Sequence, residues 1–160
     1  MKRSILRFVL LVTLLSTLGI AQTAPHEVSG TLAGSIHYVL FGPGIYDVHA
    51  LGVVSGQLKS LGFSNMFTFH EPTPQGTTVK GHFFLVAANH DKIQGTYESS
   101  FAPGPMPNQL TVTATLQIDA GTGRFAHANG TMNATAYVTA AGFDVYDWPV
   151  VWVLNGTINY

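Results

Sequence analysis

Apolar and polar residues alternate with a period of two along most of the chain, which is the pattern of β-strands with one buried face. The clearest case is the segment 110–119, where leucine, valine, alanine and isoleucine occupy every second position. Threonine, glutamine and aspartate occupy the positions between them. With glycine- and proline-rich segments taken as turns, the same pattern predicts about eight strands. They span 28–41, 46–54, 57–71, 77–88, 92–101, 110–119, 131–139 and 149–160.

No long segment shows the period of a helix, so the fold is predicted to be all-β. Eight antiparallel strands in a chain of this length predict a small closed β-barrel, filled by side chains or holding one small ligand. A two-sheet sandwich is the competing architecture. The barrel is favoured because the strands are long and most connections are short. Residues 25–160 are therefore expected to form a single barrel domain.

A glycine turn follows the strand at 110–119. Gly121 and Gly123 bracket Thr122, so the backbone is free to take positive φ on either side of the threonine. Phe125 is predicted to close the end of the hydrophobic core as a plug. Asn129, followed by glycine, is predicted to restart the chain as a strand.

Two strands depart from the alternation, because they are apolar on both faces around 83–86 and 150–154. One face of such a strand fills the barrel, and the other meets water unless something covers it. This pattern predicts a homo-oligomer in which a second subunit covers these strands. Coverage by loops, at 103–107 or 141–148, is the alternative.

The N-terminus has the pattern of an export signal. Basic residues precede an apolar run over 8–20, and small residues follow it. A signal peptide is therefore predicted over 1–24, with the mature chain beginning at Gln22 or Pro25 and residing in a secreted or periplasmic location. The alternative, a membrane anchor, is disfavoured because the apolar run is shorter than the roughly 20 residues that a helical span needs.

Composition excludes several functions. The chain has no cysteine, so disulfides, thiol nucleophiles and thiolate metal sites are ruled out. Residues 25–160 carry four basic and eight acidic side chains, a net charge of −4, which argues against nucleic acid or an anionic membrane as partner. No phosphate-binding loop, dinucleotide fingerprint or nucleophile elbow occurs, and no cofactor is expected.

The candidate site residues are few. The seven histidines show no pair at two- or four-residue spacing, and no metal site is predicted. Glu71 shares a strand face with two phenylalanines and is placed at a barrel mouth. Tyr97 lies on the dry face of its strand, where its hydroxyl needs a partner. Trp152 lines either the cavity or a subunit contact. These three are the predicted ligand-binding residues, with core packing as the alternative, and no catalytic residue is predicted.

Four segments together carry a resemblance to a known superfamily. They are 87–91 (Ala-Ala-Asn-His-Asp) with 93–97 (Ile-Gln-Gly-Thr-Tyr), 120–125 (Ala-Gly-Thr-Gly-Arg-Phe), 129–130 (Asn-Gly) and 154–158 (Leu-Asn-Gly-Thr-Ile). They are similar to the hairpin, glycine turn, strand restart and closing strand of the allene oxide cyclase and dirigent proteins. The chain resembles most closely the small exported bacterial proteins with an allene-oxide-cyclase-like barrel. The resemblance implies an apolar cavity and a preference for a trimer.

The resemblance does not extend to a catalytic set. The plant cyclase has acidic and amide side chains on its first strand and a cysteine in its cavity, whereas 35–40 here reads Ser-Ile-His-Tyr-Val-Leu. Two functions stay open. One is a barrel that binds a small hydrophobic ligand or acts as an assembly module. The other is a cyclase-like or dirigent-like isomerase that steers a reaction by the shape of its cavity. An open lumen would favour the enzyme and a filled lumen the interaction protein.

Overall fold

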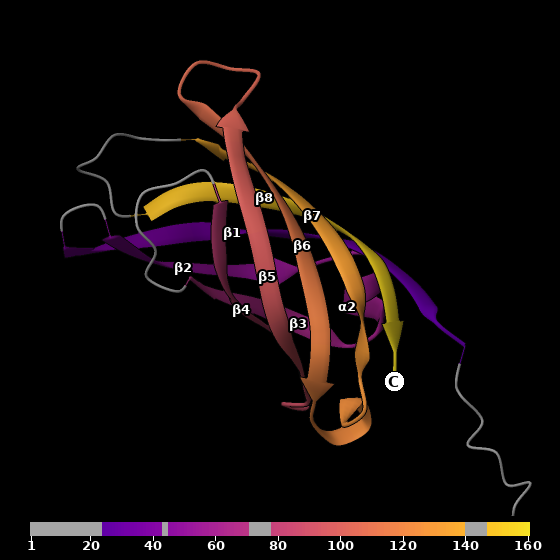
Figure 1. The fold of residues 1–160 in the computed structure, drawn as a ribbon. Coiled ribbons are helices and arrows are strands. Elements are labelled where there is room, and N and C mark those ends of the chain that lie inside the picture. The colour runs from indigo at the N-terminus through magenta and orange to yellow at the C-terminus, as the bar shows by residue number, and fades with distance from the viewer. Residues whose placement is uncertain (1–23, 43–44, 71–77, 140–146) are drawn as a thin grey trace, which may run out of the picture.

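The computed structural model describes residues 24–42, 45–70, 78–139 and 147–160, together with all their side chains except those of 38–42, 45–50, 70 and 147. The described chain forms a closed antiparallel barrel in which β1 to β8 follow one another in sequence order and β8 pairs with β1 (Figure 1). The predicted all-β, eight-stranded barrel is confirmed.

The strand boundaries agree with the predicted ones to within a few residues, except before β3. The elements are β1 (His26–Gly42), β2 (Ile45–Val54), α2 (Gln57–Ser60), β3 (Phe63–His70), β4 (Thr78–Ala87), β5 (Lys92–Pro103), β6 (Gln109–Gly121), the 3-10 helix η1 (Gly123–Phe125), β7 (Asn129–Thr139) and β8 (Asp147–Asn159).

The prediction of a strand over 57–71 was wrong at its start. Residues Gln57–Ser60 form the short helix α2, and β3 begins only at Phe63. Gly56 and Gly62 flank this helix with φ of 73° and 89°, a left-handed backbone that interrupts a strand. Leu58 is fully buried, so α2 packs its single apolar side chain into the end of the barrel.

The loop predicted at 103–107 begins slightly later than expected. Pro103 is the last residue of β5 and lies opposite Leu110 of β6, so this proline is part of the sheet after all. A proline is tolerated at the end of a strand, where no ladder hydrogen bond depends on its missing N–H. The connection itself is therefore 104–108, at the opposite end of the barrel from η1 (Figure 1).

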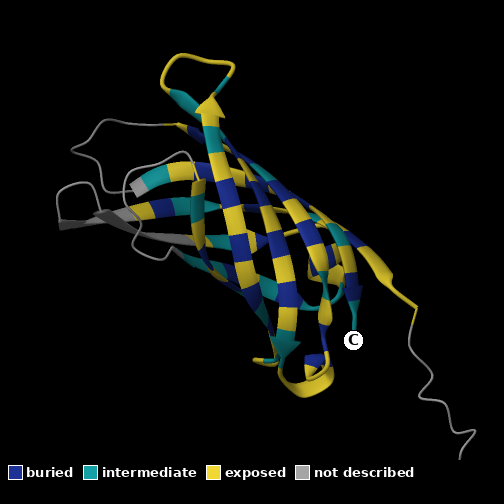
Figure 2. Ribbon diagram, viewed as in Figure 1, coloured by how far each residue is buried: buried dark blue, intermediate teal, exposed yellow. Residues whose placement is uncertain are grey.

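Buried and exposed residues alternate along β5, β6 and β7, as the period-two pattern predicted (Figure 2). The inward side chains fill the barrel in the described part of the chain. Leu32, Phe83, Ile93, Met132 and Leu154, from five different strands, are all at most 2% exposed. Packing of this kind is the main source of stability for a domain without disulfides.

The glycine turn closes one end of the barrel, and Phe125 is the predicted plug. Its ring is 1% exposed, stacks on Phe63 at 4.8 Å between centroids and meets Tyr160 edge-on at 5.0 Å. The Arg124 guanidinium lies 4.5 Å from the centroid of the Phe125 ring and donates a hydrogen bond to the carbonyl of Leu61. This contact ties η1 to the segment that leads into β3.

The two turn glycines differ in conformation. Gly123 takes a φ of 57°, as expected, whereas Gly121 lies outside the positive-φ region. Gly121 is instead constrained by close approach, because a Cβ there would collide with the carbonyl oxygen of Phe125. β7 begins at Asn129, the predicted restart, and Gly130 follows it with a φ of 150°.

Candidate functional site

The predicted site residues Tyr97 and Trp152 both face the barrel interior. They are 6% and 9% exposed and lie on β5 and β8, with β6 and β7 between these strands. The Tyr97 ring packs over Gly81, where an added Cβ would lie 2.7 Å from the tyrosine hydroxyl. Glu71 lies outside the described residues. A ligand-binding role for these three stays a prediction.

Polar groups are scarce in the described interior. Ser99 is 2% exposed, and its hydroxyl donates to the carbonyl of Val79 at 3.3 Å. Its hydrogen-bonding capacity is thus used within the sheet, between neighbouring strands β5 and β4. Among the described residues no group of three or more histidine, aspartate or glutamate side chains is placed to hold a metal ion.

The outer surface of the barrel carries an apolar face. Val53, Ala33, Val151 and Tyr137 are successive Cα partners across β2, β1, β8 and β7, so they form one row on the outside. The term "apolar face" is used below for the large exposed side chains of these strands. They are Leu51 (49% exposed), Val53 (63%), Tyr137 (45%), Val151 (47%) and Val153 (43%).

The apolar face continues onto neighbouring strands with partly buried side chains. Phe67 of β3 is the Cα partner of Leu51, and Phe84 of β4 is the partner of Phe67. The Phe84 ring meets Phe69 edge-on at 5.9 Å between centroids. Apolar side chains therefore continue around the outside from β8 to β4, and the two apolar stretches noted in the sequence, on β4 and β8, lie on opposite sides of the closed barrel, four strands apart.

The outward side chains of β5 and β6 are polar by contrast. Thr113 and Thr115 of β6 are exposed and lie opposite Ser100 and Glu98 of β5. Glu98 forms an exposed ion pair with Lys80, 3.5 Å between Oε2 and Nζ. The Glu98 side chain thus faces solvent. Two shallow hollows of about 380 and 410 Å³ lie over these strands, and Tyr97 borders the second of them.

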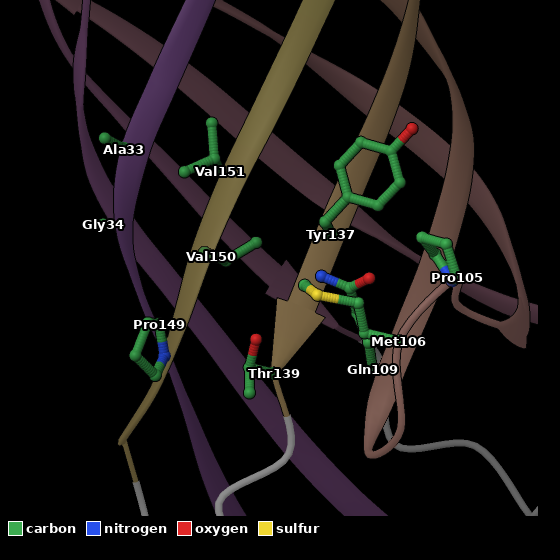
Figure 3. A pocket seen from close by; sticks show the side chains of 10 residues that line it. All are labelled: Ala33, Gly34, Pro105, Met106, Gln109, Tyr137, Thr139, Pro149, Val150 and Val151. Carbon is green, nitrogen blue, oxygen red and sulfur yellow. The ribbon is translucent and has the colours of Figure 1, made fainter.

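A larger groove, of about 630 Å³, lies at the edge of the apolar face. Figure 3 shows its lining, in which β1, β7 and β8 form one side and the connection between β5 and β6 forms the other. The lining residues are Ala33, Gly34, Pro105, Met106, Gln109, Tyr137, Thr139, Pro149, Val150 and Val151. None of these residues is charged, so the groove is suited to uncharged ligands.

Gln109 is the unusual member of this lining. Its side-chain oxygen Oε1 is buried and has no hydrogen-bond partner among the described residues. Buried polar atoms are nearly always paired, so this oxygen is a candidate to accept a hydrogen bond from a ligand or from a residue outside the described ranges. Sequence reasoning did not single out Gln109, because the groove is assembled from four strands and no local pattern marks it.

Comparisons with family models, with curated proteins and with solved structures find no match for this chain. The fold class is therefore established by the structure alone, as a closed eight-stranded antiparallel barrel. Among the described residues no helix has the length and apolar character needed to cross a membrane. The resemblance to allene oxide cyclase and dirigent proteins remains a prediction.

Proposed function

We propose that this chain is an exported barrel protein that acts as an assembly module, in which copies associate through the apolar face. The observation that carries the proposal is the row of Val53, Ala33, Val151 and Tyr137 across four strands, three of whose side chains are about half exposed or more. Contiguous apolar surface of this kind marks an interaction site on a soluble protein. The polar outer surface of β5 and β6 provides the contrast within the same molecule.

The energetics support association of moderate strength. Full burial of a valine or leucine is worth about 1.5–3 kcal/mol, so covering five half-exposed side chains contributes about 4–7 kcal/mol for each copy. This is of the same order as the cost of lost translational and rotational freedom, about 4–15 kcal/mol. Burial of the adjoining Phe67, the partner of Leu51, would add to the affinity. The resemblance noted above favours a trimer.

The packed interior supports an assembly role over catalysis in the lumen. A cavity-directed cyclase needs room for its substrate, whereas the inward side chains of the described chain are in close contact. The three hollows described above are bordered mainly by outward-facing residues. The cyclase-like alternative therefore gains no specific support from the described residues.

Light scattering of the mature protein at micromolar concentrations tests the proposal. We expect a mass that is a multiple of the single chain, and a single-chain mass for Val53→Asp, which places a charge in the apolar face. Thr96→Asp, an exposed substitution on β5 outside that face, is the matched control and should leave the mass unchanged. A wild-type protein that stays a single chain would refute the proposed assembly.

A further inference from the structure

We infer that the groove between β8, β7 and the β5–β6 connection binds a small neutral molecule with a flat apolar body and one hydroxyl group. This inference goes beyond the assembly proposed above and does not depend on it, although Tyr137 and Val151 belong to both the groove and the apolar face. It rests on three features of the groove: its apolar walls, its size and the unpaired oxygen of Gln109. Most of its lining residues face the outside of the barrel.

The walls select an apolar, uncharged ligand. Pro149, Val150 and Val151 form one side, and Pro105 and Met106 form the other (Figure 3). The volume of about 630 Å³ lies in the usual range of small-molecule sites, about 300–1,000 Å³. With no charged side chain in the lining, an ionised ligand would lose its hydration without gaining a counter-charge.

Gln109 supplies the polar contact. Its backbone is held by the turn, because its carbonyl accepts from the N–H of Gly104 at 2.7 Å and its N–H donates to the carbonyl of Met106 at 3.1 Å. The side chain is thereby kept at the groove, where Oε1 has no donor among the described residues. A ligand hydroxyl can donate to this oxygen, and a hydroxyl is suited to an amide because it both donates and accepts.

Tyr137 and Met106 favour a flat ring as the ligand body. Tyr137 offers an aromatic surface that is 45% exposed, and aromatic rings pair well with such a surface. Met106 is 58% exposed and has a flexible thioether that adapts its shape and contacts aromatic rings well. Because Oε1 is itself covered, a ligand reaches it only when a neighbouring side chain moves, and Met106 is the side chain best able to do so.

Two probes that differ only in whether their oxygen carries a hydrogen or a methyl group test the inference. They are 2-naphthol, which donates a hydrogen bond, and 2-methoxynaphthalene, which cannot. We expect calorimetric titration of the wild-type protein to show one 2-naphthol site per chain, with the methoxy compound binding about tenfold more weakly, since one buried hydrogen bond is lost. Equal affinity for the two probes, or no binding of 2-naphthol, would overturn the inference. This comparison requires no variant.

The variant Gln109→Leu tests whether Gln109 is the residue that accepts the hydrogen bond from the ligand hydroxyl. In this variant the two probes should bind equally, and 2-naphthol should bind about tenfold more weakly than to the wild type. Gln94→Leu is the control, because it makes the same glutamine-to-leucine replacement on β5, outside the groove. If Gln109→Leu retains the preference for 2-naphthol, the hydroxyl lies elsewhere and the inference fails.

Val53→Asp separates this inference from the proposed assembly, because Val53 does not line the groove. We expect Val53→Asp to bind 2-naphthol like the wild type, and Gln109→Leu to keep the wild-type mass in light scattering. Binding of 2-naphthol to Val53→Asp but not to the wild type would mean that a second copy occupies the groove. That result would overturn the small-molecule site while leaving the assembly intact.

Discussion

Replacing Gly123 by valine should destabilise the barrel at its closed end. Gly123 has a φ of 57°, a left-handed conformation that costs an ordinary residue about 1–2 kcal/mol and a β-branched residue more. A Cβ at this position also collides with the carboxylate of Asp91. That carboxylate accepts from Asn89 Nδ2 at 2.8 Å and from the N–H of Arg124 at 3.3 Å.

The backbone strain and the collision with Asp91 together determine how far the free energy of unfolding falls. Displacement of the partly buried Asp91 side chain loses hydrogen bonds worth about 1 kcal/mol each. When this loss is added to the backbone strain, the free energy of unfolding of Gly123→Val should fall by about 3 kcal/mol. In an Asp91→Ala background the collision is absent, so the same substitution should cost only the backbone part, about 1–2 kcal/mol.

Urea denaturation at one fixed protein concentration measures these values, since self-association makes unfolding depend on concentration. The midpoint should fall while the slope m stays constant. Ala126→Val places the same valine side chain in the same turn, at an exposed position with a φ of −54°, and it serves as control. A midpoint for Gly123→Val equal to that of Ala126→Val would refute this account of the turn.

Two further predictions concern β4 and the N-terminus. Gly81→Ala should lower the free energy of unfolding by about 1–3 kcal/mol in urea denaturation, because the new methyl group meets the Tyr97 ring and the carbonyl of Phe69. The neighbouring substitution Lys80→Ala should lower it by at most about 1 kcal/mol, because the ion pair of Lys80 is exposed. Equal effects of the two substitutions would contradict the packing role of Gly81. The mature protein should begin at Gln22 or Pro25 by intact mass, and a mature chain that retains residues 1–20 would contradict the proposed export.

The strands were predictable because their signal is local. Along β6 every inward position is apolar and nearly every outward one is polar, so the pattern alone defines both the strand and its buried face. The helix α2 was missed because Gln57–Ser60 has one buried side chain and no period to detect. Its boundaries are set by the positive φ of Gly56 and Gly62, and a glycine in a sequence does not reveal which conformation it adopts.

The candidate sites were less predictable than the fold. Apolar residues on both faces of β8 indicated an uncovered surface, and the structure leaves Val151 and Val153 exposed there. That Val53 and Tyr137 join Val151 in one row follows from strand register, which no single segment encodes. The importance of Gln109 depends on burial of one atom by residues distant in sequence, so it emerges only from the assembled barrel.

Pairing of β1 with β8 makes the first strand of the barrel depend on the last. His26 lies opposite Ile158, and its ring stacks on Tyr160 at 4.8 Å between centroids. The contacts that seal the barrel thus join the first and the last strand, whose residues are far apart in the sequence, and such non-local contacts slow folding. Until β8 arrives, β1 exposes an unpaired edge that invites pairing with another chain. Newly made chains are therefore most vulnerable to aggregation before the C-terminal strand docks, and a chain shortened by that strand should remain in this vulnerable state permanently.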